Sequence, residues 1–208
     1  MKQLFLTSSV HAVAHDIAKR LDLTTSNELV FITTPVEPEI GDKTWLKNDR
    51  QALVNVGFKV TDYTITDKTI DQLKKDLKGF NYIYVSGGNT LYFLRQAQKS
   101  GFISLIKDFV NKEGKIYIGT SAGSIITGPK CPDYLLSKEE VLDIENQKGF
   151  ELVNFTILPH WGSESFRDKY LSDRLTIAYK NNQVPLLLLN DNQYVYVQGD
   201  KFEIVDLR

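Results

Sequence analysis

The chain has 208 residues, of which 42% are hydrophobic and 25% are charged, so it can bury one substantial core. Its 25 lysines and arginines are balanced by 26 aspartates and glutamates, which gives a formal net charge of −1 and no basic surface for nucleic acid. A membrane is excluded as well, because no apolar run approaches the roughly 18 residues of a transmembrane helix.

Short apolar runs alternate with amphipathic segments in the first half of the chain. We predict four strands, each followed by a helix: residues 3–7 and then 10–21, 28–33 and then 44–56, 58–65 and then 70–77, and 81–85 and then 90–98. A further strand at 116–118 is apolar throughout, which is typical of a strand buried on both faces. This alternation predicts a three-layer α/β/α fold with a mainly parallel central sheet.

The second half has a different pattern. Residues 139–149 are charged and indicate a helix or loop, 155–158 a short strand, and 166–179 a helix. Strands at 184–189, 194–197 and 202–205 are separated by turn-forming residues, so we expect a parallel strand and then a C-terminal antiparallel hairpin. Without a repeat or a Pro/Gly-rich linker, residues 1–208 are predicted to form a single domain.

The strand at 116–118 runs into a Gly-x-Ser-x-Gly motif, Gly119-Thr120-Ser121-Ala122-Gly123. This pattern is typical of a nucleophile elbow, in which the serine sits on a sharp turn between a strand and a helix. The two glycines let the strand and the helix approach closely. Ser121 is therefore the candidate nucleophile.

A serine hydroxyl needs a base, and the chain has three histidines. His160 follows a predicted strand, at the sheet edge where catalytic groups gather in α/β proteins, and it is our candidate base. His11 and His15 are four residues apart and would share a helix face, but without a third ligand we expect surface packing and no metal or cofactor.

The base in turn needs a carboxylate that orients it. Asp191 follows a predicted strand, whereas Asp133 lies in the loop beyond the elbow, and aspartate is also a common turn residue. We place Asp191 ahead and leave Asp133 open.

The predicted oxyanion hole takes one N–H from Ala122, the residue after the nucleophile, and a second from Gly88. The loop that contains Gly87, Gly88, Asn89 and Thr90 ends the neighbouring predicted strand, where paired glycines let a substrate approach the backbone. A simpler interpretation, a tight turn with Asn89 as helix N-cap, fits this loop equally well.

Three motifs occur together in one order: Ser86-Gly87-Gly88-Asn89-Thr90, then Gly119-Thr120-Ser121-Ala122-Gly123, then Pro159-His160. This set resembles the serine peptidase family of aspartyl dipeptidase and cyanophycinase. The resemblance implies a fold similar to class I glutamine amidotransferases, with Ser121 at the position of their cysteine and His160 as its base. The third member is described either as a glutamate near the late hairpin, where this chain has Asp191, or as an aspartate before the histidine, which matches Asp133.

The resemblance also implies hydrolysis of a small peptide after an N-terminal acidic residue. Reading that acidic side chain would need a cation, for which Lys130, Arg95 and Arg167 are candidates. Two other hypotheses stay open: an α/β-hydrolase type esterase that uses Asp133, and a catalytically silent peptide-binding protein, which the aspartate in place of glutamate at 191 suggests.

The N-terminal apolar run is too short for a signal peptide, and the single cysteine, Cys131, fits a reducing compartment, so we expect a cytoplasmic protein. A homodimer is a further expectation. If Trp45, Trp161 and Phe166 are exposed, their aromatic rings can line a surface that binds a second copy of the chain. Trp161, beside His160, is alternatively a wall of the substrate pocket or part of the core.

Overall fold

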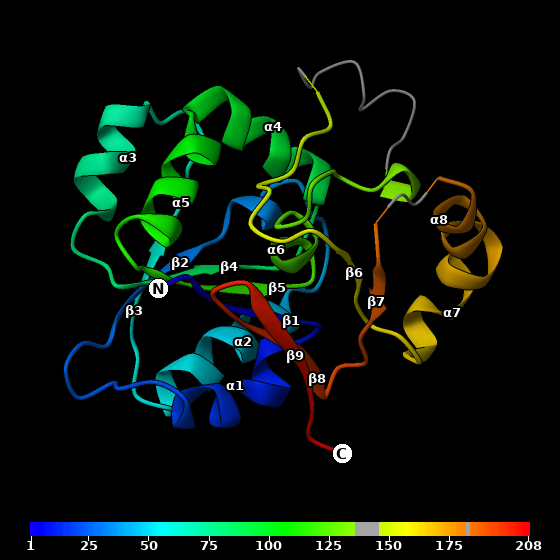
Figure 1. Ribbon diagram of the computed structural model, residues 1–208, viewed down its shortest axis with the longest axis horizontal. Helices are drawn as coiled ribbons and strands as arrows, with labels where there is room; N and C mark the ends of the chain where they lie inside the picture. Colours follow the sequence, from blue (N-terminus) through cyan, green and yellow to red (C-terminus); the bar gives the residue numbers. More distant parts are fainter. Residues whose placement is uncertain (136–145, 182–183) are drawn as a thin grey trace.

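The computed structural model describes residues 1–135, 146–181 and 184–208. Within these residues, a seven-stranded sheet has the order β3-β2-β4-β5-β1-β8-β9 (Figure 1). Neighbouring strands from β3 to β1 are parallel, whereas β8 and β9 are antiparallel. The strands are β1 (Gln3–Thr7), β2 (Glu28–Ile32), β3 (Lys59–Tyr63), β4 (Tyr82–Val85), β5 (Ile116–Thr120), β8 (Gln193–Gln198) and β9 (Lys201–Asp206). The predicted parallel sheet and C-terminal hairpin are both confirmed.

Helices cover both faces of this sheet (Figure 1). One face carries α1 (Val10–Lys19) and α2 (Thr44–Asn55), and the other carries α3 (Ile70–Leu77), α4 (Thr90–Ser100) and α5 (Phe102–Asn111). Of these helices, α5 was not predicted from the sequence. Within the described ranges, none of the helices is long and apolar enough to cross a bilayer.

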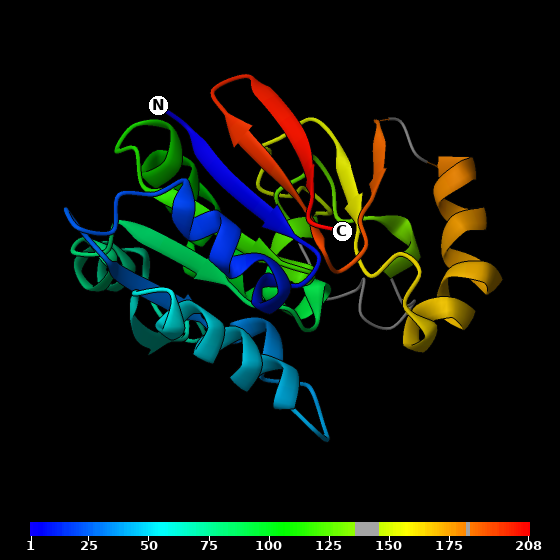
Figure 2. The same ribbon diagram turned by 90° about the horizontal axis from the view of Figure 1, so that it is seen from below.

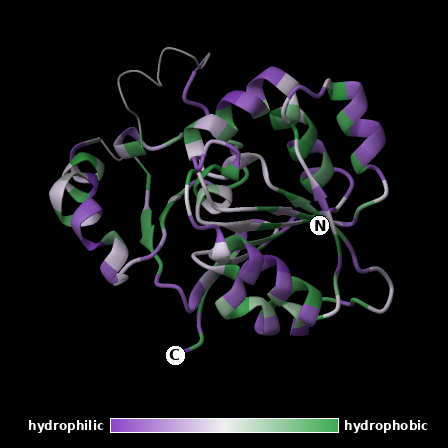
Figure 3. Ribbon diagram, turned by 180° about the vertical axis from the view of Figure 1, so that it is seen from behind, coloured by the Kyte–Doolittle hydropathy of each residue, from purple (hydrophilic) through white to green (hydrophobic). Residues whose placement is uncertain are grey.

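The core lies between the helices and the sheet. Successive strand residues alternate between its two halves: Phe5 packs on the side of α1 and α2, and Leu4 and Leu6 pack on the side of α3 to α5. The helices correspondingly carry both hydrophobic and hydrophilic residues, as the hydropathy colouring in Figure 3 shows. Burial of both faces explains why the strands are almost continuously apolar.

A smaller parallel pair, β6 (Thr156–Leu158) with β7 (Leu186–Leu188), lies beside the main sheet (Figures 1 and 2). The helical segment expected at 166–179 consists of several short turns: η4 (Glu164–Phe166), α7 (Arg167–Lys169), η5 (Tyr170–Arg174) and α8 (Leu175–Asn181). Most of the charged segment at 139–149 lies outside the described residues, since these exclude 136–145.

Candidate active site

Ser121 stands on the turn between β5 and the short helix α6 (Ala122–Ile125). Its backbone has φ of 49° and ψ of −107°, a combination that a residue with a Cβ rarely adopts. The Ser121 N–H donates to the Thr7 carbonyl at 3.1 Å, which ties the turn to the neighbouring strand β1. This strained and anchored turn is the geometry of a nucleophile elbow.

The two glycines of the motif are required by close backbone contacts. A Cβ on Gly119 would lie 2.6 Å from the Gly123 carbonyl oxygen, and one on Gly123 would lie 2.3 Å from the Val85 carbonyl oxygen. Neither position has room for a larger residue. The motif therefore holds α6 directly against β4 and β5.

Three side chains from distant parts of the sequence form one hydrogen-bonded chain. His160 Nε2 lies 3.1 Å from Ser121 Oγ, and His160 Nδ1 lies 2.7 Å from Asp191 Oδ1. The hydrogen bond from His160 holds the pKa of Asp191 below its usual value, although burial opposes the shift. The arrangement can take the proton from Ser121 and keep the imidazole oriented while it does so.

Ser8, which follows β1, supports this chain and was not among the sequence-based candidates. Its buried hydroxyl donates to Asp191 Oδ1 at 2.7 Å and accepts the backbone N–H of His160 at 2.7 Å. His160 needs such support because its φ is 61°, in the left-handed region. The available signal was a polar residue at the carboxyl end of a parallel strand beside the elbow strand.

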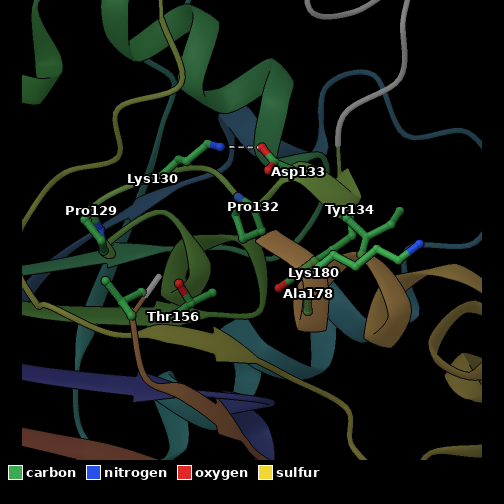
Figure 4. Close-up of a pocket in the computed structure, with 10 residues that line it drawn as sticks. Pro129, Lys130, Pro132, Asp133, Tyr134, Thr156, Ala178 and Lys180 are labelled. Atoms are coloured by element: carbon green, nitrogen blue, oxygen red, sulfur yellow. Dashed lines mark ion pairs between the residues drawn. The ribbon is translucent and has the colours of Figure 1, made fainter. Parts of the chain in front are cut away.

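Asp133 lies elsewhere. It begins the short helical turn η2 (Asp133–Leu135), and its carboxylate is 2.5 Å from Lys130 Nζ. Figure 4 shows this ion pair at the edge of a separate cavity of about 500 Å³. Of the two carboxylates left open by the sequence, Asp191 is the one that contacts His160.

The loop after β4 lies against the elbow. A Cβ on Gly87 would lie 3.3 Å from Ser121 Cβ, so the Gly87 backbone borders the serine directly. Gly88 has φ of +127°, and a Cβ there would lie 2.3 Å from the Pro35 carbonyl oxygen. The loop is therefore held directly beside Ser121 by close backbone contacts.

The interpretation of Asn89 as a helix N-cap is confirmed. Asn89 accepts the Tyr92 N–H at 2.8 Å as N-cap of α4, and its own N–H donates to the Pro35 carbonyl at 2.8 Å. Thr90 is the first residue of α4 and is buried. The helix cap at Asn89 and the bond to Pro35 therefore fix the position of the glycines that precede them.

Ser121 lines a cavity of about 640 Å³, a size typical of small-ligand sites. Gly87, Gly88, Asn89 and Thr90 line it, and its charged or titratable side chains are His11, Glu39, Asp49, Tyr134, His160, Lys169 and Arg174. The cations expected from the sequence lie elsewhere: Lys130 pairs with Asp133, Arg167 pairs with Glu164, and the Arg95 guanidinium lies over the Tyr92 ring. Lys169 and Arg174 take their place in the lining.

Two of the three aromatic residues expected at the surface belong to this cavity. Trp45 is half-buried and lies against Gly87, and the Phe166 ring stacks on His160 with centroids 4.4 Å apart. Trp161 is outside the cavity lining; it is 37% exposed and lies 6.2 Å from the Tyr170 ring. Phe166 is thus the aromatic neighbour of His160 on the cavity side.

His11 and His15 do not act as a pair. His11 is hydrogen-bonded to Asp49 in the cavity wall, whereas His15 is exposed one helical turn further along α1. Over the part of the chain that the structure describes, no three His, Cys, Asp or Glu side chains gather as metal ligands.

Comparison with known proteins identifies the family of this chain. Residues 4–205 match the model of a family described as Peptidase family S51. An uncharacterized peptidase of Listeria monocytogenes is 26% identical over 96% of both chains. A probable alpha-aspartyl dipeptidase of Drosophila melanogaster is 27% identical over 73% of this chain and 62% of its own.

The crystal structure of a putative peptidase E from Listeria monocytogenes has the same fold. It covers 100% of both chains, with a TM-score of 0.87 and 26% sequence identity.

Proposed function

This chain belongs to peptidase family S51, and from that premise we propose that it is a serine exopeptidase that cleaves after an N-terminal acidic residue. The observation that carries the proposal is the chain of contacts from Ser121 Oγ through the His160 ring to Asp191. A serine with a base in reach, and a base with an orienting carboxylate, is the arrangement that nucleophilic acyl transfer requires.

In the proposed reaction His160 takes the proton of Ser121 while Oγ attacks the scissile carbonyl carbon. The tetrahedral intermediate collapses when His160 returns the proton to the departing amine, which leaves an acyl group on Ser121. A water molecule, deprotonated by His160, then attacks this ester and releases the acidic residue. Asp191 stays ionised throughout and stabilises the imidazolium.

The oxyanion is assigned to the N–H groups of Ala122 and Gly88. Ala122 is the first residue of α6, so its N–H has no acceptor within the helix. Gly88 lies in the loop beside Ser121, with its conformation set by the contact with Pro35. Two fixed donors of this kind stabilise developing negative charge more than the neutral carbonyl of the substrate.

The proposed specificity rests on the charges in the cavity. Arg174 and Lys169 line it and supply positive charge for an acidic side chain. Glu39, in the same lining, is placed to pair with the free α-ammonium group that an exopeptidase must recognise. The name of the Drosophila melanogaster relative, a probable alpha-aspartyl dipeptidase, agrees with this assignment.

The other two hypotheses receive less support. An esterase that uses Asp133 is disfavoured, because that carboxylate pairs with Lys130. A silent binding protein was suggested by the shorter side chain at 191, yet Asp191 reaches His160 at 2.7 Å.

The test is hydrolysis of Asp-Leu, Glu-Leu, Ala-Leu, Leu-Leu and a short acyl ester by wild type and Ser121→Ala. We expect cleavage of Asp-Leu and Glu-Leu that disappears in the variant. Turnover by Ser121→Ala at the wild-type rate would overturn the mechanism, and preferred cleavage of Ala-Leu or of the ester would overturn the specificity.

A further inference from the structure

His11, the second residue of α1, lies in the wall of the cavity that contains Ser121. Its Nδ1 is 2.9 Å from Asp49 Oδ1 and 3.0 Å from Ser9 Oγ. These contacts occupy one ring nitrogen and hold the plane of the ring. The side chain lines the cavity and is 43% exposed, so Nε2, which these contacts do not use, can serve a ligand there.

Asp49, on α2, is an acceptor for three donors. Oδ2 accepts the Tyr84 hydroxyl at 2.9 Å, and Oδ1 accepts the His11 backbone N–H at 3.3 Å as well as the ring. Burial raises the pKa of the Tyr84 phenol well above its usual value, so the hydroxyl remains a donor. Asp49 is 2% exposed, and these donors, the His11 ring among them, replace the water that its carboxyl group loses on burial.

The charge on His11 follows from these contacts. The hydrogen bond with Asp49 raises the pKa of His11, against the opposing effect of burial, and the charge of Asp191 raises it further. Besides His11 and Asp49, the charged or titratable groups of the cavity are Glu39, Tyr134, His160, Lys169 and Arg174. The protonated ring carries an N–H at Nε2, which is a donor for an anion.

The two sources of positive charge come from different parts of the molecule. His11 belongs to α1, on the face of the sheet that α1 and α2 cover, whereas Lys169 and Arg174 come from α7 and η5, beyond β6 (Figures 1 and 2). A dipeptide with an acidic first residue has two carboxylates at opposite ends. Two separate cationic positions match such a substrate.

Building on the proposed function, we infer that the imidazolium of His11 binds the C-terminal carboxylate of the departing residue, while Arg174 and Lys169 bind the acidic side chain. The α-ammonium group is not a partner for His11, because the two are of like charge. His11 then makes a free carboxylate directly after the scissile bond a condition for efficient cleavage, which favours dipeptides over longer chains.

The experiment compares Asp-Leu with its C-terminal amide, Asp-Leu-NH₂, on wild type, His11→Asn and His15→Asn. Asparagine can still donate to Asp49 from the position of Nδ1 but has nothing at Nε2. We expect His11→Asn to lower kcat/KM for Asp-Leu by about 10- to 100-fold, mainly through KM, and for the amide by less than about 3-fold. His15→Asn is the matched control on the same helix, and it should leave both substrates unchanged.

An equal loss on both substrates would overturn the inference and indicate that His11 only holds α1 to α2. If wild type cleaves none of these peptides, the proposed hydrolysis fails by itself, and binding decides about His11. Titration of Ser121→Ala protein, followed by the NMR signals of the His11 ring, should then show a shift with Asp-Leu and none with the amide; no shift with either contradicts the inference.

Discussion

Two histidine–aspartate pairs border the same cavity, and their burial is reversed. In the pair His160–Asp191 the side chains are 16% and 43% exposed, whereas in the pair His11–Asp49 they are 43% and 2% exposed. Water can solvate the charge of Asp191, which also contacts His160 Nδ1. Asp49 has no such access, and its hydrogen bond raises the pKa of His11. The same two residue types thus suit a proton-transferring base in one place and an anion-binding group in the other.

The elements behind the two pairs also differ. His160 and Asp191 lie in loops after β6 and before β8, and Ser8 fixes both of them. His11 and Asp49 belong to two helices packed on each other, and their contact also ties α1 to α2. Changes in the first pair should therefore affect activity, and changes in the second should affect stability and substrate choice.

The largest expected effect comes from removing the base. We expect His160→Ala to lower kcat on Asp-Leu by about 10⁴- to 10⁶-fold, because Ser121 then has no proton acceptor. The measurement is steady-state hydrolysis, with circular dichroism to verify the fold. If the variant kept more than about one hundredth of the wild-type rate, His160 could not be the base.

The next effect separates the two aspartates that the sequence left open. Asp191→Asn should lower kcat about 10³- to 10⁴-fold, since an amide cannot stabilise the imidazolium that forms on His160. Asp133→Asn, the matched control, should change kcat less than about 3-fold, because it loses only a partly exposed ion pair with Lys130. A larger loss in Asp133→Asn than in Asp191→Asn would reverse the assignment.

These aspartates show what the sequence can predict about this site and what it cannot. Ser121 is recognisable because its conformation depends on adjacent glycines, and His160 because it directly follows a strand. The partners of a histidine depend on how loops and helices pack: Asp49 is 38 residues from His11, and Ser8 is 152 from His160. No local spacing encodes such contacts.

The fold, like the site, could be predicted from the sequence only in part. Alternating strands and helices indicated the parallel sheet, because burial on both faces leaves long apolar runs. The segment from 166 to 179 has helical spacing, but this spacing does not reveal that the segment divides into the end of η4, α7, η5 and part of α8. It also does not reveal that Lys169 and Arg174 line the cavity. That placement depends on β6 and β7 pairing apart from the main sheet.

A stability measurement sharpens the comparison of the two pairs. Asp49→Ala removes the shared acceptor of Tyr84 and His11, and should lower the free energy of unfolding by about 2 kcal/mol. Asp191→Ala, at a half-exposed position, should lower it by less than about 1 kcal/mol. Denaturant unfolding of both variants gives the two values. Equal losses would contradict the different roles assigned to these carboxylates.

The smallest effect is a pH dependence that differs in sign between the pairs. The folded-state pKa of His11 is raised, so its contact with Asp49 stabilises the fold fully below the unfolded value of about 6.5 and loses this contribution as the pH rises through the folded pKa. Because His11 is 43% exposed, solvent screening limits the contribution to about 0.5 kcal/mol. The pKa of Asp191 is lowered, so its contribution is present above about pH 4 and is lost as the pH falls.

The difference in unfolding free energy between wild type and His11→Asn should therefore be larger at about pH 5.5 than at about pH 8.5, with no such trend for His15→Asn. A difference that is the same at both values would mean that Asp49 does not hold His11 charged. Acid therefore weakens the His160–Asp191 pair, whereas alkali weakens the His11–Asp49 pair. Binding of a free C-terminal carboxylate, which we assign to His11, should accordingly weaken as the pH rises through the pKa of His11.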